Sequence, residues 1–173
     1  LPDRGIKIGT TLRGRTASSG FLGRPALPDD APRSLRDPAE RARRKAMLGE
    51  LHILPLAEYV ARLRKQGNGQ VPDFDPMDGG LYARALFLFE KPGRMTAEAE
   101  GGSGFISRNN DDPTAEATYK FMRAAVIHRK LTLLWNVIPW WNGTTDITAE
   151  ELNEGVSSIK ELISLLPYVR AVM

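Results

Sequence analysis

Two short runs of apolar residues are the clearest structural signal in this sequence. The first is the unbroken run of residues 86–89, in a strand predicted over about residues 84–89, and it ends abruptly at Glu90-Lys91-Pro92-Gly93. The second covers residues 131–135, with one threonine among its apolar residues, and ends at Asn136. Such runs are typical of strands that are buried on both faces of a parallel sheet. A third strand is predicted over residues 169–173.

Two helices are predicted before the first strand. One begins at Asp37, which can cap it, with proline at the first helical position and Glu40 three residues on, as in a capping box. This helix should run to about residue 48. The second should run from about residue 55 to Gly67, with one apolar face made of Leu56, Tyr59, Val60 and Leu63.

Two further helices are predicted between the strands. Asp112 can cap a helix that extends to about residue 125, and Thr148 with Glu151 forms a second capping-box signature. The order of strands and helices predicts a three-layer α/β/α sandwich with a short parallel sheet. On the last helix, six apolar residues at helical spacing are expected to be buried: Leu152, Val156, Ile159, Leu162, Ile163 and Leu166.

Composition divides the chain into three parts. Residues 1–36 are rich in glycine, proline, serine and arginine, and are predicted to form a basic extended arm. Residues 37–70 form a helical segment, and residues 71–173 form the α/β domain, which opens with a turn-rich connection. Because a strand at the end of the chain would leave a bare sheet edge, we expect this domain to continue beyond Met173.

The absence of cysteine limits the chemistry open to this protein. The chain has 173 residues, no cysteine and only two histidines, His52 and His128. A disulfide scaffold, a thiolate zinc site and a cysteine-ligated iron–sulfur cluster are therefore excluded, and a histidine-rich metal site is disfavoured. The lack of cysteine suits an intracellular protein, and no apolar run reaches membrane-spanning length. We expect a cytoplasmic, bacterial-type monomer with no membrane partner.

Basic residues are concentrated near the N-terminus. The formal net charge is +3, and residues 1–45 contain 11 of the 24 lysines and arginines but only five of the 21 acidic residues. This excess fits a solvated arm and helix face, or a surface that contacts phosphate groups. The sequence leaves both readings open.

Three loops are expected to meet at the carboxyl edge of the sheet, where open α/β folds bind their ligands. They cover residues 90–94, 103–112 and 136–142. Within them, residues 109–112 are interpreted mainly as a turn and a helix cap. Trp140 and Trp141 are interpreted mainly as packing residues, with base stacking open to at most one of them.

The order of motifs in these loops resembles that of the uracil-DNA glycosylase superfamily, over roughly residues 71–173. Glu90-Lys91-Pro92-Gly93 matches the family's loop after the first strand, and Gly104-Phe105 matches its phenylalanine segment. Asn136-Val137-Ile138-Pro139 matches the segment in which the second strand ends in asparagine. The family's His-Pro-Ser type motif on a final strand has no counterpart in this chain.

This resemblance implies a fold of uracil-DNA-glycosylase type and a DNA glycosylase that works in base excision repair. Such enzymes flip a damaged or deaminated base, here most readily uracil, out of DNA and hydrolyse its N-glycosidic bond. Neither a metal nor an organic cofactor is expected. Two alternatives remain open: a nucleic-acid-binding member of the fold without catalysis, and an α/β domain that binds a nucleotide or phosphometabolite.

The resemblance also implies which residues bind the base. Phe105 would stack on the flipped base, Asn136 would form hydrogen bonds with its edge, and the backbone at Gly93 would approach it closely. Each side chain also has a purely structural reading. Phe105 could be a core residue beneath the loop, and the Asn136 amide could close the turn after the strand.

Glu90 and Lys91 are the catalytic candidates. Lys91 stands where the family often has an aspartate or asparagine that positions water, which makes the adjacent Glu90 the candidate for water activation. Lys91 could also act as an amine nucleophile, or the two residues could form a structural or phosphate-facing pair. Arg94 and Arg108 are expected to contact the DNA backbone.

Overall fold

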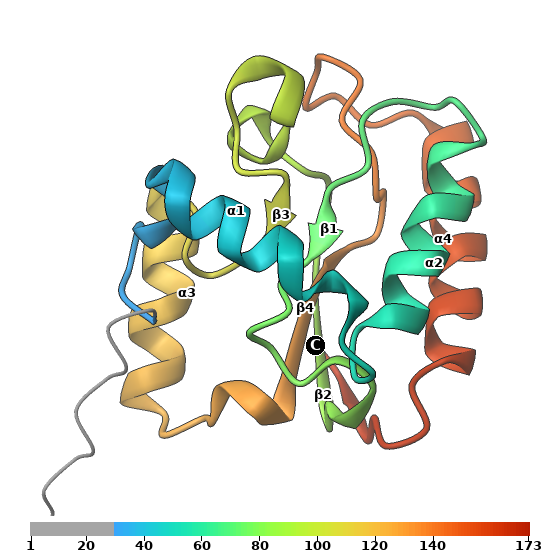
Figure 1. The fold of residues 1–173 in the computed structure, drawn as a ribbon. Coiled ribbons are helices and arrows are strands. Elements are labelled where there is room, and N and C mark those ends of the chain that lie inside the picture. Colours follow the sequence, from blue (N-terminus) through green and yellow to red (C-terminus); the bar gives the residue numbers. More distant parts are fainter. Residues whose placement is uncertain (1–29) are drawn as a thin grey trace, which may run out of the picture.

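The two apolar runs form adjacent parallel strands at the centre of the fold (Figure 1). In the second, residues 132–135 are all buried, as predicted, whereas in the first only Leu86 is fully buried. The structure is a computed structural model that describes residues 30–173. Strand β2 (Ala85–Phe89) pairs along its whole length with β4 (Thr132–Asn136), and β5 (Ala171–Val172) pairs with the other edge of β2. The sheet therefore has the order β4-β2-β5, and the prediction of a parallel sheet is confirmed.

A second, two-stranded parallel sheet lies in segments that the sequence analysis treats as connections. Strand β1 (Asp73–Phe74) pairs with β3 (Phe105–Ile106), and the Asp73 N–H donates to the Gly104 carbonyl at 2.8 Å. Two residues are too short to produce a recognisable apolar run. Only the tertiary pairing therefore identifies these strands.

The four α-helices of the described residues cover both sides of the strands. In Figure 1, α3 (Pro113–Ala124) lies on one side, and α2 (Leu54–Arg64) and α4 (Ala149–Ser164) lie together on the other. Helix α1 (Pro38–Ala46) crosses in front of the strands. This is a mixed α/β sandwich, as the sequence predicts at the level of fold class.

The predicted helix starts are confirmed, with one correction. Asp112 caps α3, and Thr148 with Glu151 forms both hydrogen bonds of the predicted capping box on α4. Asp37 caps α1, but the carboxylate of Glu40 does not return to the Asp37 N–H. It binds two arginines in the next turn instead, because guanidinium groups at those positions compete for it.

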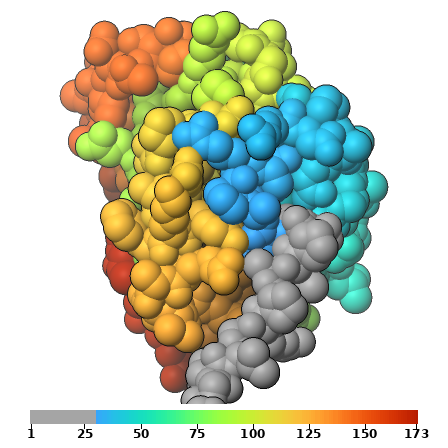
Figure 2. All heavy atoms as spheres, turned by 90° about the vertical axis from the view of Figure 1, so that its left-hand side faces the viewer, coloured from blue at the N-terminus to red at the C-terminus, as the bar shows by residue number. Residues whose placement is uncertain are grey.

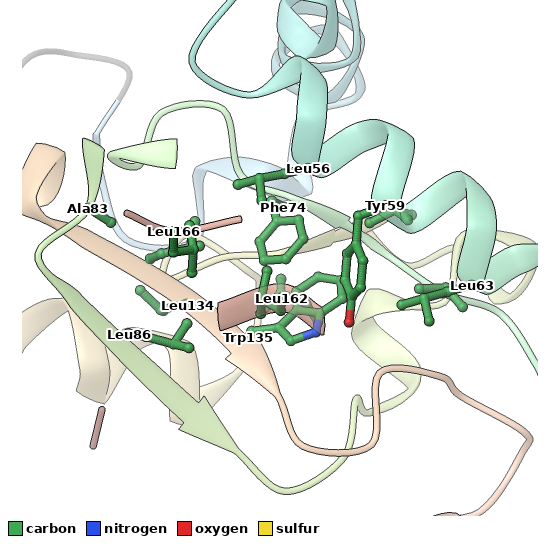
Figure 3. Close-up of a cluster of buried hydrophobic side chains, with 14 of the residues drawn as sticks. Leu56, Tyr59, Leu63, Phe74, Ala83, Leu86, Leu134, Trp135, Leu162 and Leu166 are labelled. Atoms are coloured by element: carbon green, nitrogen blue, oxygen red, sulfur yellow. The ribbon is translucent and has the colours of Figure 1, made fainter. Parts of the chain in front are cut away.

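Helix α2, which precedes the sheet, shares one hydrophobic core with it (Figure 3). Tyr59 of α2 packs beside Phe74 and Trp135, whose rings stack with centroids 3.7 Å apart. Leu162 and Leu166 approach this cluster from the C-terminal half of the chain. The predicted apolar face of α2 is buried throughout, which confirms that prediction.

The prediction for the buried face of α4 is wrong in part. Leu152, Val156 and Ile163 remain 46%, 43% and 42% exposed, and the side turned inward is formed by Gly155, Ser158 and Leu162. A Cβ at Gly155 would lie only 2.5 Å from the Val137 carbonyl oxygen. The helix therefore packs through its small residues, and half of its apolar stripe faces outward.

Candidate functional site

The loops after β2 and β3 and the first turn of α3 enclose a pocket of about 370 Å³. It lies at the carboxyl ends of β2 and β4, so the loops of residues 90–94 and 103–112 meet there, as expected. Of the third expected loop, residues 136–142, only Asn136 lines the pocket. Its apolar lining includes Phe89, Ile106 and Leu134, and its polar lining includes Ser107, Asn110, Asp112 and Asn136.

Asn136, at the end of β4, brings an amide with an unpaired oxygen to this pocket. The residue is 4% exposed, and its Oδ1 has no hydrogen-bond partner within the part of the chain that the structure describes. The amide does not close the turn, because backbone bonds do so: the Val137 and Ile138 N–H groups donate to the carbonyls of Phe89 and Glu90 at 2.7 and 2.9 Å. An unpaired buried acceptor costs about 1–3 kcal/mol. A ligand with a hydrogen-bond donor would relieve this cost.

Phe105 does not line the pocket. It is fully buried, and its ring centroid lies 5.1 Å from the Lys45 ammonium on the side of α1. Adjacent strand residues point to opposite faces, so it is Ile106 that lines the pocket. This placement favours the reading of Phe105 as a core residue. The aromatic residue in the lining is Phe89, which the sequence analysis treats only as part of a strand.

Glu90 and Lys91 do not form a pair. The Lys91 side chain is 2% exposed, and its ammonium donates to Glu151 Oε1 at 2.7 Å and to the Asp146 carbonyl at 2.8 Å. This hydrogen bond from Lys91 lowers the pKa of Glu151. Glu90 is exposed and does not line the pocket, so its placement does not support water activation. The Lys91 amine is engaged by two acceptors, which disfavours its use as a nucleophile.

Gly93 and Arg94 lie at the pocket as expected, whereas Arg108 does not. A Cβ at Gly93 would meet no atom within 4 Å, so the space beside this backbone is open to a ligand. The Arg94 side chain is 73% exposed at the rim. Arg108 is buried, and its guanidinium donates to Asp30 Oδ2 at 2.5 Å. Burial and pairing make Arg108 unsuitable as a contact to a DNA phosphate.

A buried network of charges holds the loop that carries Ser107 and Asn110. Ser107 Oγ donates to Asp75, and the Arg129 guanidinium donates to Asp75 Oδ2 at 2.5 Å and to Asp78 Oδ1 at 2.7 Å. Burial opposes ionisation of Asp75, but Arg129 and then Arg44 hold its pKa below the ordinary value. For Asp78 burial dominates and raises the pKa to about 6. The side chains come from segments far apart in sequence, so no local motif reveals this network.

Asp30, the first residue that the structure describes, also takes part in this charge network. The Asp30 carboxylate accepts from Arg129 Nη1 at 2.7 Å, and its carbonyl accepts from the Tyr119 hydroxyl at 2.6 Å. Figure 2 shows the segment that begins at residue 30 lying against α3. Residues 30–36 are therefore anchored, while the rest of the predicted arm, residues 1–29, lies outside the described residues.

No histidine or tryptophan side chain lines the pocket. His52 Nε2 lies 2.9 Å from the Pro76 carbonyl oxygen, and His128 is exposed. Trp140 and Trp141 are buried, and Trp141 Nε1 donates to Glu100 Oε1 at 2.6 Å. Both tryptophans therefore act as packing residues in this structure.

Sequence reasoning identified Asp112 only as a helix cap and missed its position in the pocket. Its Oδ1 accepts from the Ala115 N–H at 2.9 Å, as the predicted cap requires. The same residue also lines the pocket, and no other carboxylate among residues 30–173 does so. Sequence offered a signal for the cap, but none for its position opposite the end of β4.

Comparisons with known proteins leave the chain without a family assignment. No protein-family profile matches it, and no curated protein matches it. Within residues 30–173, no group of three histidine, cysteine or acidic side chains is arranged to hold a metal ion. None of the helices in this range combines the length and hydrophobicity that crossing a membrane requires.

Proposed function

We propose that the pocket holds a single nucleobase and that the protein is a DNA glycosylase of the uracil-DNA glycosylase superfamily. The observation that carries this proposal is the buried amide of Asn136, whose Oδ1 has no partner among the described residues, in a pocket with apolar walls. An amide offers a donor and an acceptor in one plane, which suits a pyrimidine edge that carries both. Uracil has such an edge, so uracil in DNA is the substrate we favour.

The walls of the pocket suit a flat ring. Phe89, Ile106 and Leu134 supply apolar surface, and the open side of Gly93 lets a ligand approach the backbone. Stacking on an aromatic face does not depend on the identity of the base. In this proposal Phe89 takes the stacking role that the resemblance gives to Phe105, and Asn136 supplies the selectivity.

The reaction breaks the bond between C1′ of the sugar and the ring nitrogen of the base. The bonding electrons leave with the base, water adds to C1′, and a proton from that water neutralises the departing base. A carboxylate near the sugar stabilises its developing positive charge and orients the water. Asp112 takes this role in place of Glu90, because its carboxylate lines the pocket and is held by the start of α3.

One observation favours a second candidate, a base-binding protein without catalysis. The residue that stands at the family's water-positioning site, Lys91, is engaged by Glu151 and the Asp146 carbonyl. If Asp112 serves only as a helix cap, the pocket binds a base and does not cleave it. In either case we propose a cytoplasmic protein that acts on DNA as a monomer.

The test is release of uracil from single- and double-stranded oligonucleotides, detected by alkaline cleavage at the abasic site. We expect product with the unmodified protein and a loss of about 100-fold or more with Asn136→Ala. Asn153→Ala, which changes an exposed asparagine on α4, is the matched control and should keep full activity.

Three results would contradict the proposal. Unchanged activity of Asn136→Ala would show that the amide does not read the base. Tight DNA binding without abasic product would favour the non-catalytic candidate. No DNA binding, together with thermal stabilisation by free nucleotides, would favour a nucleotide- or phosphometabolite-binding domain.

A further inference from the structure

The Asp30 carboxylate is held by a cluster of hydrogen-bond donors outside the pocket. Arg129 Nη1 donates to its Oδ1 at 2.7 Å, Arg108 Nη2 donates to its Oδ2 at 2.5 Å, and the Asn109 amide donates to Oδ1 at 3.3 Å. None of these side chains lines the pocket. Guanidinium groups that converge on one oxyanion are the donors with which proteins bind phosphate as well as carboxylate.

The cations of this cluster are buried, whereas the anion is partly exposed. The side chains of Arg108 and Arg129 are 4% and 6% exposed, and that of Asp30 is 20% exposed. A third arginine, the exposed Arg123, donates to the Tyr119 hydroxyl at 3.1 Å, and this hydroxyl donates to the Asp30 carbonyl. The cluster therefore opens to the surface at the position of the carboxylate.

The Asp30 carboxylate uses only part of the Arg108 guanidinium. Arg108 Nε is buried and has no hydrogen-bond partner among residues 30–173, and Nη1 lies 3.8 Å from the Met122 sulfur, a weak acceptor. Asp30 is the only acidic residue in this range that forms an ion pair with Arg108. A guanidinium commonly binds an oxyanion through two parallel N–H groups. Arg108 therefore has donor capacity that a single carboxylate leaves unused.

The other donors stay in place without Asp30. Arg129 also donates to Asp75 and Asp78, at 2.5 and 2.7 Å, and its Nη1 donates to Asn109 Oδ1 at 2.6 Å. The Asn109 N–H donates to Ser107 Oγ at 3.0 Å. Because these bonds fix the arginine and the amide independently, an anion that replaces Asp30 meets donors that are already positioned.

We propose that Arg108, Arg129 and Asn109 form a binding site for a small phosphate-type anion, and that Asp30 occupies this site in its absence. The site lies outside the pocket and is independent of the proposed function. A phosphate group carries close to two negative charges near neutral pH and has three strong acceptor oxygens, so it can engage the free Nε of Arg108. Burial of the guanidinium groups admits a free anion or a small phosphomonoester and excludes the bulkier backbone of DNA.

The test measures thermal unfolding of the full chain in inorganic phosphate and in sodium chloride of equal ionic strength. Asp30→Ala leaves Arg108 buried without an anion, so its unfolding midpoint in chloride should lie about 5 °C or more below that of the unmodified protein. Phosphate should restore about half of this loss or more, because it binds only the folded state. The unmodified protein should gain less than about 1 °C, since its own carboxylate competes for the site.

Three further variants make the test specific. Asp30→Asn removes the charge with little change in size and should respond to phosphate in the same direction. Asp111→Ala removes a carboxylate that the partly exposed Arg33 binds at 2.9 Å, and phosphate should not restore its stability. Asp30→Ala/Arg108→Gln lacks the cation as well, and calorimetric titration should show that it binds phosphate at least about tenfold more weakly than Asp30→Ala does.

Four results would overturn the inference. Absence of any phosphate effect on both Asp30 variants would make Asp30 a purely structural residue, and equal recovery of Asp111→Ala would make the effect of phosphate unspecific. Equal recovery in acetate would mean that the site takes a carboxylate only. Recovery by an oligonucleotide without uracil, and not by free phosphate, would assign the site to the DNA backbone. None of these measurements depends on base release, so failure here leaves the proposed function intact.

Discussion

At the scale of single residues, two polar side chains at the pocket combine structural and proposed functional roles in different ways. Asp112 caps α3 and also lines the pocket, so its structural role fixes the position of its charge. Asn136 has no such support, because its buried Oδ1 is unpaired. The first residue should therefore stabilise the fold, and the second should weaken it.

Substitution of Asp112 by asparagine separates its role as a helix cap from the effect of its negative charge. Asparagine caps helices about as well as aspartate, so Asp112→Asn should change the free energy of unfolding by less than about 0.5 kcal/mol. On the proposed mechanism, base release should fall by about 100-fold, because asparagine lacks the charge proposed to stabilise the sugar cation. Denaturant unfolding and the oligonucleotide assay measure the two effects. Full activity of Asp112→Asn would exclude the catalytic role, and Asp112→Ala provides the comparison that loses both functions.

Substitution of Asn136 by leucine should raise stability while it removes activity. Leucine has a similar size and no unpaired acceptor, so the free energy of unfolding should rise by about 1 kcal/mol. Uracil release should disappear, because the donor and acceptor for the base edge are gone. A loss of stability in Asn136→Leu would mean that the amide has a partner in solution.

At the scale of elements, the Lys91–Glu151 pair joins the loop after β2 to the first turn of α4. The two residues lie 60 positions apart, and Glu151 also takes part in the capping box. The ammonium is nearly buried, while the carboxylate is partly exposed. This pair therefore fixes one wall of the pocket relative to the helix on the far side of the sheet.

Removal of Lys91 tests this link against an exposed ion pair that joins α4 to α2. Lys91→Met should lower the free energy of unfolding by about 1–3 kcal/mol, because Glu151 loses a charged hydrogen-bond donor. Arg62→Ala breaks the exposed Arg62–Glu161 pair at 2.7 Å and should cost less than about 1 kcal/mol. Equal effects in denaturant unfolding would contradict the structural role of Lys91.

Borohydride should also fail to trap the protein on uracil-containing DNA, because the Lys91 amine is engaged by Glu151 and by the Asp146 carbonyl.

At the scale of the whole molecule, the buried charge network links the start of the described chain, the loop after β3 and the segment before β4. Burial raises the pKa of Asp78 to about 6, above its ordinary value of 3.8. A raised pKa means that the folded state holds the proton more tightly than the unfolded state does. The stability from Asp78 is therefore fully present below about pH 4 and is lost as the pH rises through about 6.

The pH dependence of unfolding measures this effect directly. The free energy of unfolding of Asp78→Asn, minus that of the unmodified protein, should increase between about pH 4 and 6 and stay constant above that range. Replacement of the exposed Asp146 by asparagine should not reproduce this trend. A difference that is flat across the whole range would mean that Asp78 stays ionised in the folded state. Below about pH 4, protonation of Asp75 and Asp30, whose pKa values are lowered, should destabilise both proteins.

The sequence by itself determined the four α-helices, the three strands of the main sheet and their order, but not the short strands β1 and β3. Asp112 and Thr148 mark helix starts through hydrogen bonds that span three residues. The runs that end at Phe89 and Trp135 are long enough to mark strands, of which only the second is buried throughout. These signals are local, so they can be read from a short window of sequence. They also sufficed to bring the loops after β2 and β3 to one edge of the sheet.

Only the tertiary structure decided which side chains face the pocket. Ile106 lines it and Phe105 does not, because a single step along a strand reverses the direction of the side chain. Asp112 lines it and Glu90 does not, and Arg108 is buried by its pairing with Asp30, which lies 78 residues away. These outcomes depend on packing between distant segments, which no local pattern encodes. Long-range contacts therefore determine which side chains line the candidate site, whereas short-range signals determine the helices and strands that carry them.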